Sequence, residues 1–175
     1  MDHTKSIELL NAAISAEMQS IHQYMYFHIY FENNGFSFLS NLFDQIIMVE
    51  IKHLEILTHR ITFLDGDIEL KFDSKIQQNI SSLEMLCLAK DMEEKMVKNY
   101  KEWAIIVDSE NDVVTSKLFK ELATQESEHH KEFNLQLYTL KCSELDILNK
   151  FDEVSNTSQP IYNSSECSIL EPEIV

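Results

Sequence analysis

The chain has 175 residues and a formal net charge of −16, from 30 Asp and Glu against 14 Lys and Arg. It contains only two glycines and two prolines, whereas average usage would give a chain of this length roughly 12 and 9. This scarcity excludes glycine-rich phosphate loops and argues against a many-stranded β fold, and the negative charge argues against a basic nucleic-acid interface. Since 44% of the residues are hydrophobic, we expect one domain with a proper core.

The cysteines and the first residues bear on the compartment. Cys87, Cys142 and Cys167 show no CxxC spacing, so we expect reduced thiols instead of a disulfide framework or a zinc site. The N-terminal residues lack the pattern of a secretory signal, and no apolar stretch reaches the roughly 18 residues of a membrane span. We therefore predict a cytoplasmic protein with no membrane span.

The first half of the chain predicts two long helices. Residues 6–33 carry apolar side chains with a 3.6-residue period as far as Gly35, and residues 36–64 do so as far as Gly66. Glycine enters the left-handed backbone region without steric cost. We therefore expect both glycines to act as left-handed residues that end a helix.

The second half repeats this layout after a polar connection over residues 67–79. A third helix is predicted over residues 81–107, and it opens with a capping sequence from Ser81 to Glu84. A fourth is predicted over residues 112–140. Two helical hairpins joined by one long connection predict an all-α four-helix bundle with a long crossover between helices two and three.

The C-terminal part has a different composition. Residues 143–151 are compatible with a short fifth helix, and Ser, Asn, Thr and Pro accumulate from residue 152 onward. We therefore expect one bundle domain over residues 1–151 and a flexible polar tail over residues 152–175.

A Glu-x-x-His motif occurs in both halves of the chain. It places a carboxylate and an imidazole one turn apart on the same helix face, as Glu50 and His53 in helix two and as Glu126 and His129 in helix four. One such motif in so acidic a chain carries little weight, because chance matches are common.

The spacing around the two motifs is what makes them informative. Glu17 precedes the first motif's Glu and His by 33 and 36 residues, and Glu93 precedes those of the second motif by the same numbers. Tyr24 and Tyr100 each follow their glutamate by seven residues, which is about two turns. The chain is therefore interpreted as a duplicated helical hairpin.

The six repeated Glu and His residues point to a metal centre. The glutamates lie among apolar residues, and burying such groups unpaired would cost several kcal/mol each. Two divalent cations would balance four carboxylates, and a Glu with a Glu-x-x-His from each half is the ligand set of di-iron carboxylate bundles. Mixed oxygen and nitrogen ligands favour Fe(II), with Mn(II) and Zn(II) as competitors.

From about residue 5 to residue 145 the sequence resembles bacterioferritin, within the ferritin-like superfamily. The motifs that carry the resemblance are Leu10-Asn11, Ser20-Ile21-His22-Gln23-Tyr24, Glu50-Ile51-Lys52-His53, the run from Arg60 to Gly66, and Glu84-Met85-Leu86. The resemblance implies that Glu50 and Glu126 bridge two irons per subunit. It also implies that Glu17 and His53 complete the coordination of one iron, and that Glu93 and His129 complete that of the other.

The resemblance also implies a function. It predicts a ferroxidase that oxidises Fe(II) with O2 or H2O2 at these six catalytic and metal-binding residues. Independently of the resemblance, Tyr24 and Tyr100 could donate hydrogen bonds to the ligand carboxylates or donate electrons, and we expect the hydrogen-bonding role. Fe(III) would be stored in a hollow homo-oligomer, usually of 24 subunits, with no nucleic-acid or membrane partner.

The sequence departs from the family at the haem position. Bacterioferritins carry a haem-ligating Met directly after the bridging Glu of helix two, and here that residue is Ile51, which has no donor atom. We therefore expect no haem bound in that way, and we interpret Met48, one turn earlier, as a core methionine.

Two other functions remain open. One is a ferritin-like di-metal oxidoreductase without storage, either a rubrerythrin-like peroxidase or a manganese catalase, although no CxxC pair for a rubredoxin module is present. The other is an inactive structural or binding bundle, which six intact ligands argue against.

Overall fold

The computed structural model describes residues 3–71 and 75–154, and their side chains as far as residue 142. Four helices make up this part of the chain, and it contains no strand. They are α1 (Thr4–Asn33), α2 (Ser37–Phe63), α3 (Ser82–Ser109) and α4 (Val113–Val154). The all-α bundle predicted from the sequence is confirmed.

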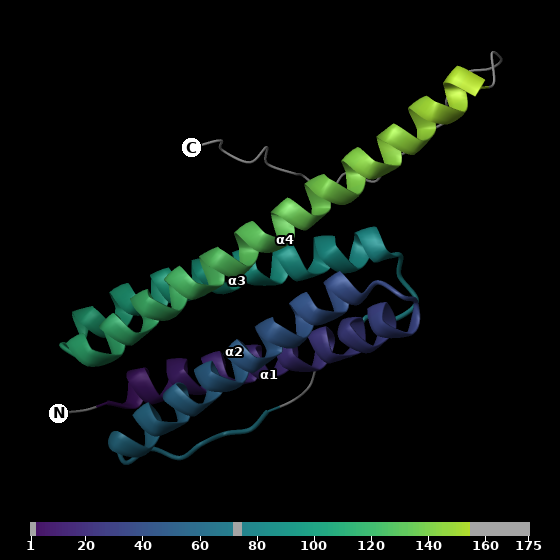
Figure 1. Ribbon diagram of the computed structural model, residues 1–175. Coiled ribbons are helices and arrows are strands. Elements are labelled where there is room, and N and C mark those ends of the chain that lie inside the picture. The colour runs from purple at the N-terminus through teal and green to yellow at the C-terminus, as the bar shows by residue number, and fades with distance from the viewer. Residues whose placement is uncertain (1–2, 72–74, 155–175) are drawn as a thin grey trace.

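The helices form two antiparallel hairpins, α1 with α2 and α3 with α4 (Figure 1). The connection between α2 and α3 runs the length of the bundle, because α2 ends at the opposite end from the start of α3. This is the predicted long crossover. No helix in the described ranges is long and apolar enough to cross a membrane.

The core consists of two apolar clusters, one toward each end of the bundle. One contains Leu10, Leu57 and Phe119, and the other contains Phe27 and Phe133. On every helix, the predicted metal ligands fall between the residues of one cluster and those of the other. The polar residues are thus enclosed midway along the bundle by apolar packing on both sides.

Three helices end with a left-handed residue. Gly35 ends α1 with φ 79°, as predicted, whereas α2 and α3 end with Asp65 at φ 55° and Asn111 at φ 62°. In each case the residue directly after the left-handed one donates its N–H to the carbonyl five positions earlier, as Gly66 does to Ile61 at 3.0 Å.

The prediction that Gly66 itself is left-handed is therefore wrong, because Asp65 takes that conformation. Gly66 is instead explained by its close packing against α1. A Cβ atom on it would lie 2.9 Å from the side chain of Ile7, so the loop can approach α1 only with glycine at this position.

Two amide side chains of α1 hold the crossover. Asn11 donates to the carbonyl of Asp67 at 2.9 Å and accepts from the N–H of Glu69 at 2.7 Å. Gln23 does the same with a single residue, Gln77, at 2.9 and 2.8 Å. The polar connection therefore keeps a fixed path along α1 on both sides of its undescribed segment.

The C-terminal helix is longer than predicted. Residues 143–151, predicted as a possible separate fifth helix, are helical but continue α4 without a break to Val154. In Figure 1 this end of α4 extends beyond the other three helices. The predicted tail from residue 152 lies outside the described residues from 155 onward, as does Cys167. Cys87 and Cys142 form no disulfide within the described residues.

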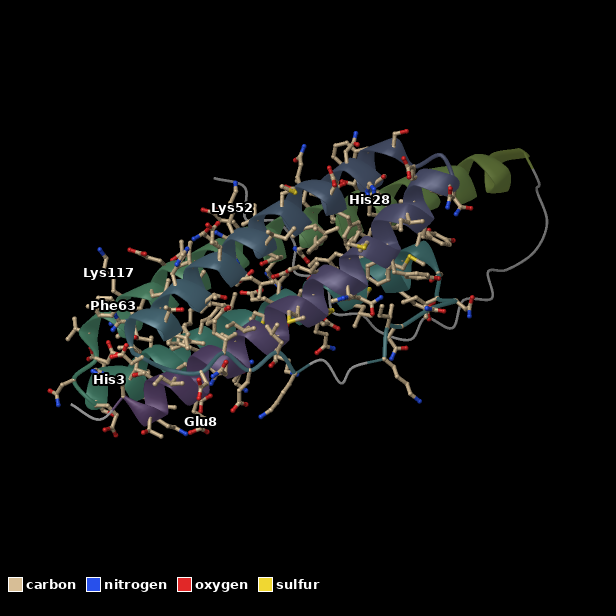
Figure 2. The ribbon with its side chains drawn as sticks, turned by 90° about the horizontal axis from the view of Figure 1, so that it is seen from below. His3, Glu8, His28, Lys52, Phe63 and Lys117 are labelled. Carbon is tan, nitrogen blue, oxygen red and sulfur yellow. The ribbon has the colours of Figure 1, made fainter. Side chains whose placement is uncertain are left out.

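The start of α4 is fixed by a buried charge. Asp112 accepts from the backbone N–H of Thr115 at 3.1 Å and from its hydroxyl at 2.7 Å, and thereby caps the helix. Arg60, from the end of α2, donates to Asp112 at 2.7 Å. This node lies at the end of the bundle where Figure 2 shows His3 and Phe63. The predicted capping box of Ser81 is also present at the start of α3.

Replacing Asp112 with alanine is expected to lower the free energy of unfolding by about 2–4 kcal/mol, because α4 loses its cap and Arg60 loses its ion pair, although Arg60 still donates to the Thr115 hydroxyl. Urea unfolding of the metal-free protein measures this loss. Asp112→Asn keeps the capping oxygen but not the charge, so we expect it to cost less. Equal costs for both variants would show that the ion pair carries all of the effect.

Candidate metal centre

The structure brings the six repeated residues together midway along the bundle. Each helix contributes either a single glutamate or a Glu and a His one turn apart. They are Glu17 on α1, Glu50 and His53 on α2, Glu93 on α3, and Glu126 and His129 on α4. All four carboxylates are at most 1% exposed. Neighbouring residues on the same helix point outward, as Lys52 does in Figure 2.

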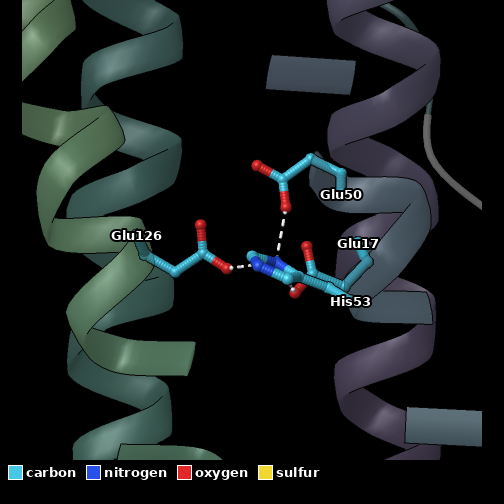
Figure 3. Close-up of side chains that lie close together, drawn as sticks. All are labelled: Glu17, Glu50, His53 and Glu126. Carbon is cyan, nitrogen blue, oxygen red and sulfur yellow. Dashed lines mark ion pairs between the residues drawn. The ribbon is translucent and has the colours of Figure 1, made fainter. Parts of the chain in front are cut away.

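One group of ligands surrounds His53. Its Nδ1 lies 2.8 Å from Glu50 Oε2, 3.1 Å from Glu126 Oε1 and 3.4 Å from Glu17 Oε1. Figure 3 shows these carboxylates converging on the imidazole from three helices. The potential ligand atoms of the group all lie within 4.8 Å of one another, a spacing that could hold a metal ion.

The second group surrounds His129 in the same way. Its Nδ1 lies 2.9 Å from Glu50 Oε1, 3.2 Å from Glu126 Oε2 and 3.8 Å from Glu93 Oε2. Glu50 and Glu126 therefore belong to both groups, and each directs one oxygen to each imidazole. This geometry suits two metal positions that share two bridging carboxylates and have one further Glu and one His each.

Several buried atoms of the centre lack a hydrogen bond. Both carboxylate oxygens of Glu50, Oε1 of Glu126 and Nδ1 of His53 have no hydrogen-bond partner among the described residues. Buried polar groups in proteins are almost always satisfied. Carboxylate oxygens and imidazole nitrogens are donors that divalent transition metals take, so these residues fit a pair of such ions.

The outer carboxylates behave as buried acids. Burial, together with the charge of Glu126, raises the pKa of Glu17 well above its usual value despite its contact with His53. Burial raises the pKa of Glu93 to about 8, although His129 lies beside it. Without a cation, these two side chains therefore hold protons that a metal would have to displace.

The imidazoles and a bridging carboxylate form charged contacts. Burial opposes the charged imidazole, but the adjacent carboxylates of Glu126 and Glu50 raise the pKa of His129 to about 12, and those of Glu126 and Glu17 likewise raise the pKa of His53. Burial also works against the Glu126 carboxylate, yet the two adjacent imidazoles lower its pKa to about 2. In the metal-free protein, the positive charges of the two imidazoles therefore balance part of the carboxylate charge, as metal cations would.

The two tyrosines link the halves of the centre. Tyr24 on α1 donates its hydroxyl to Glu93 on α3, and Tyr100 on α3 donates to Glu17 on α1. Both tyrosines are fully buried, and burial raises the pKa of each, so they remain donors. Each outer carboxylate is therefore oriented by the tyrosine of the opposite half.

One contact of the centre was missed by the sequence analysis. Gln125 Oε1 lies 3.2 Å from His53 Nε2. Gln125 directly precedes Glu126, whereas the equivalent residue before Glu50 is Val49. Comparing the two halves for mismatches as well as matches would have found it.

The haem position lies outside the centre. Ile51 is 44% exposed and Met48 is 52% exposed, both on α2. The prediction that Met48 is a core residue is therefore wrong.

Fold and site together define a class of protein: a duplicated four-helix bundle with a buried set of residues that could hold two metal ions, made of a Glu and a Glu-x-x-His from each half. Residues 7–143 match the ferritin-like domain. The chain belongs to the ferritin-like family.

The curated relatives agree with this assignment. The bacterioferritin of Desulfovibrio desulfuricans is 26% identical over 125 residues, which cover 71% of this chain and 70% of that protein. The bacterioferritin of Streptomyces coelicolor is 26% identical over 149 residues, 84% and 83% of the two chains. That of Brucella melitensis is 29% identical over 127 residues, 71% and 78%. The resemblance to bacterioferritin stated from the sequence is confirmed.

Proposed function

We propose that this protein is a ferroxidase that stores iron. The observation that carries the proposal is the pair of overlapping ligand groups, which share Glu50 and Glu126 and are completed by one Glu and one His each. Two adjacent positions of this kind suit a reaction that takes one electron from each of two Fe(II) ions. The membership in the ferritin-like family and the bacterioferritin relatives support iron as the metal.

In this proposal Fe(II) is the substrate and the stored cargo. Two Fe(II) ions give up two electrons, which together with two protons reduce one O2 to H2O2, or one H2O2 to two water molecules. The protein supplies position and charge. Four carboxylates neutralise the incoming cations, and the Tyr24 and Tyr100 hydroxyls hold the outer carboxylates in place.

The oxidised iron would be stored in a hollow homo-oligomer, for which we propose 24 subunits on the strength of the bacterioferritin relatives. The cytoplasmic location stays a prediction from the sequence. We also propose that haem is not bound through the residue after Glu50, because Ile51 offers no donor atom.

Solution mass, combined with iron content after aerobic Fe(II) loading, tests the proposal. We expect a large assembly that holds many more than two irons per chain. A dimer that holds two metals per chain and turns over peroxide would instead support a rubrerythrin-like peroxidase or a manganese catalase. Failure to bind Fe(II) would support a structural bundle.

A further inference from the structure

The two halves of the metal centre are alike in their ligands but differ behind the imidazoles. His53 Nε2 lies 3.2 Å from Gln125 Oε1, so the side of the ring away from the carboxylates has a hydrogen-bond acceptor. At the equivalent position of the other half, directly before Glu50, the residue is Val49, whose side chain has no acceptor. Exposure differs in the same direction, since the His53 side chain is 1% exposed and the His129 side chain 12%.

This hydrogen bond determines how His53 can bind a metal. Nδ1 faces the carboxylates, and an imidazole that ligates through one nitrogen must carry its proton on the other. An acceptor at Nε2 stabilises that tautomer, fixes the ring orientation and makes Nδ1 a better donor. Val49 cannot supply such an acceptor to His129, whose side chain is also the more exposed of the two.

We propose that Gln125 is a positioning residue that makes the two metal positions unequal, so that the position of His53 and Glu17 binds its ion first and more tightly. The position of His129 and Glu93 then fills second. This inference rests on the proposed metal centre, and it concerns residues that the Glu and His pattern does not include.

Stepwise metal binding tests the inference without relying on iron oxidation. The metal-free assembled protein is titrated with Co(II) under anaerobic conditions, and the ligand-field absorption is followed. We expect two steps whose dissociation constants differ by roughly 10- to 100-fold, the usual effect of an imidazole's hydrogen-bond partner on affinity. In Glu93→Gln the tight step should survive, and in Glu17→Gln the weak one.

Variants at the two mismatched positions separate hydrogen bonding from packing. Gln125→Met keeps the length of the side chain but has no acceptor, so the tight step should weaken until the two steps merge. Gln125→Glu keeps an acceptor and should preserve two steps. Val49→Gln offers an acceptor to His129 and should tighten the weak step.

The possible outcomes are distinguishable. Two equal Co(II) steps in the unmodified protein, or unchanged steps in Gln125→Met, would overturn the inference and leave the metal centre standing. A lower melting temperature of metal-free Gln125→Met with unchanged Co(II) steps would show that Gln125 serves packing alone. No Co(II) binding by the unmodified protein would instead overturn the proposed metal centre itself.

Discussion

Glu50→Gln is expected to remove both metal positions at once, whereas Glu93→Gln should remove only one. Glu50 directs Oε2 to His53 and Oε1 to His129, at 2.8 and 2.9 Å. Glu93 reaches only the His129 group. The amide has no negative charge and offers only one oxygen, so it cannot serve two cations in place of a carboxylate.

Metal content and oxidation rate measure this difference. Equilibrium dialysis with Co(II) should fall from two ions per chain to none in Glu50→Gln and to one in Glu93→Gln. The initial rate of Fe(II) oxidation should fall at least about 10-fold in both, because loss of a ligand should cost no less than loss of a group that only orients one.

An exposed glutamate on the same helix provides the control. Glu55 on α2 is 69% exposed and pairs only loosely with His59, at 3.8 Å. Glu55→Gln removes the same charge from α2 and should leave both measurements unchanged. If Glu50→Gln bound one ion and oxidised Fe(II) at the normal rate, Glu50 would not bridge the two positions.

Much of the centre could be predicted from sequence because helical geometry fixes which residues share a face. Glu50 and His53 lie one turn apart whatever their surroundings, and the repeat of the 33- and 36-residue offsets relates the two halves. Helical geometry does not predict which residue on another helix a side chain contacts. Tyr24 shares a face with Glu17, yet its hydroxyl reaches Glu93, because only the packing of α1 against α3 decides that contact.

The local errors have a similar origin. Glycine is the residue best suited to a left-handed position, but Asp tolerates it as well, and the close approach of Ile7 leaves Gly66 no room for a side chain. The composition changes near residue 143 without a proline or glycine to stop α4, so the helix continues. Met48 shares a helix with core residues, but the period alone could not show that its face is uncovered.

The metal-free protein and the metal-loaded protein should respond to pH in opposite directions. Without metal, the folded chain holds protons more tightly than the unfolded chain at four of the six residues. The pKa of Glu93 rises from 4.5 to about 8, that of His129 from 6.5 to about 12, and those of Glu17 and His53 also rise. A raised pKa in the folded state means that stability is lost as the pH rises above the unfolded value.

As the pH rises from the unfolded-state pKa of such a group to its folded-state pKa, the free energy of unfolding falls by about 1.4 kcal/mol per pH unit, and this pH range is the window of the group. For Glu93 the window runs from 4.5 to about 8, and for His129 it opens at 6.5. Glu126 acts in the other direction, since its pKa falls from 4.5 to about 2 and its contribution is lost only in acid below 4.5. Thermal unfolding with a chelator should therefore show a melting temperature that falls from pH 6 to pH 9.

Metal reverses this slope, because a cation must displace the same protons before the ligands can bind it. Over the same pH range, protein loaded with redox-inert Zn(II) should show a melting temperature that rises or stays level. Glu93→Gln removes one of the titrating groups, so its metal-free decline should be shallower. If the chelated and Zn(II)-loaded proteins showed the same slope, the six residues would not be the groups that exchange protons for metal.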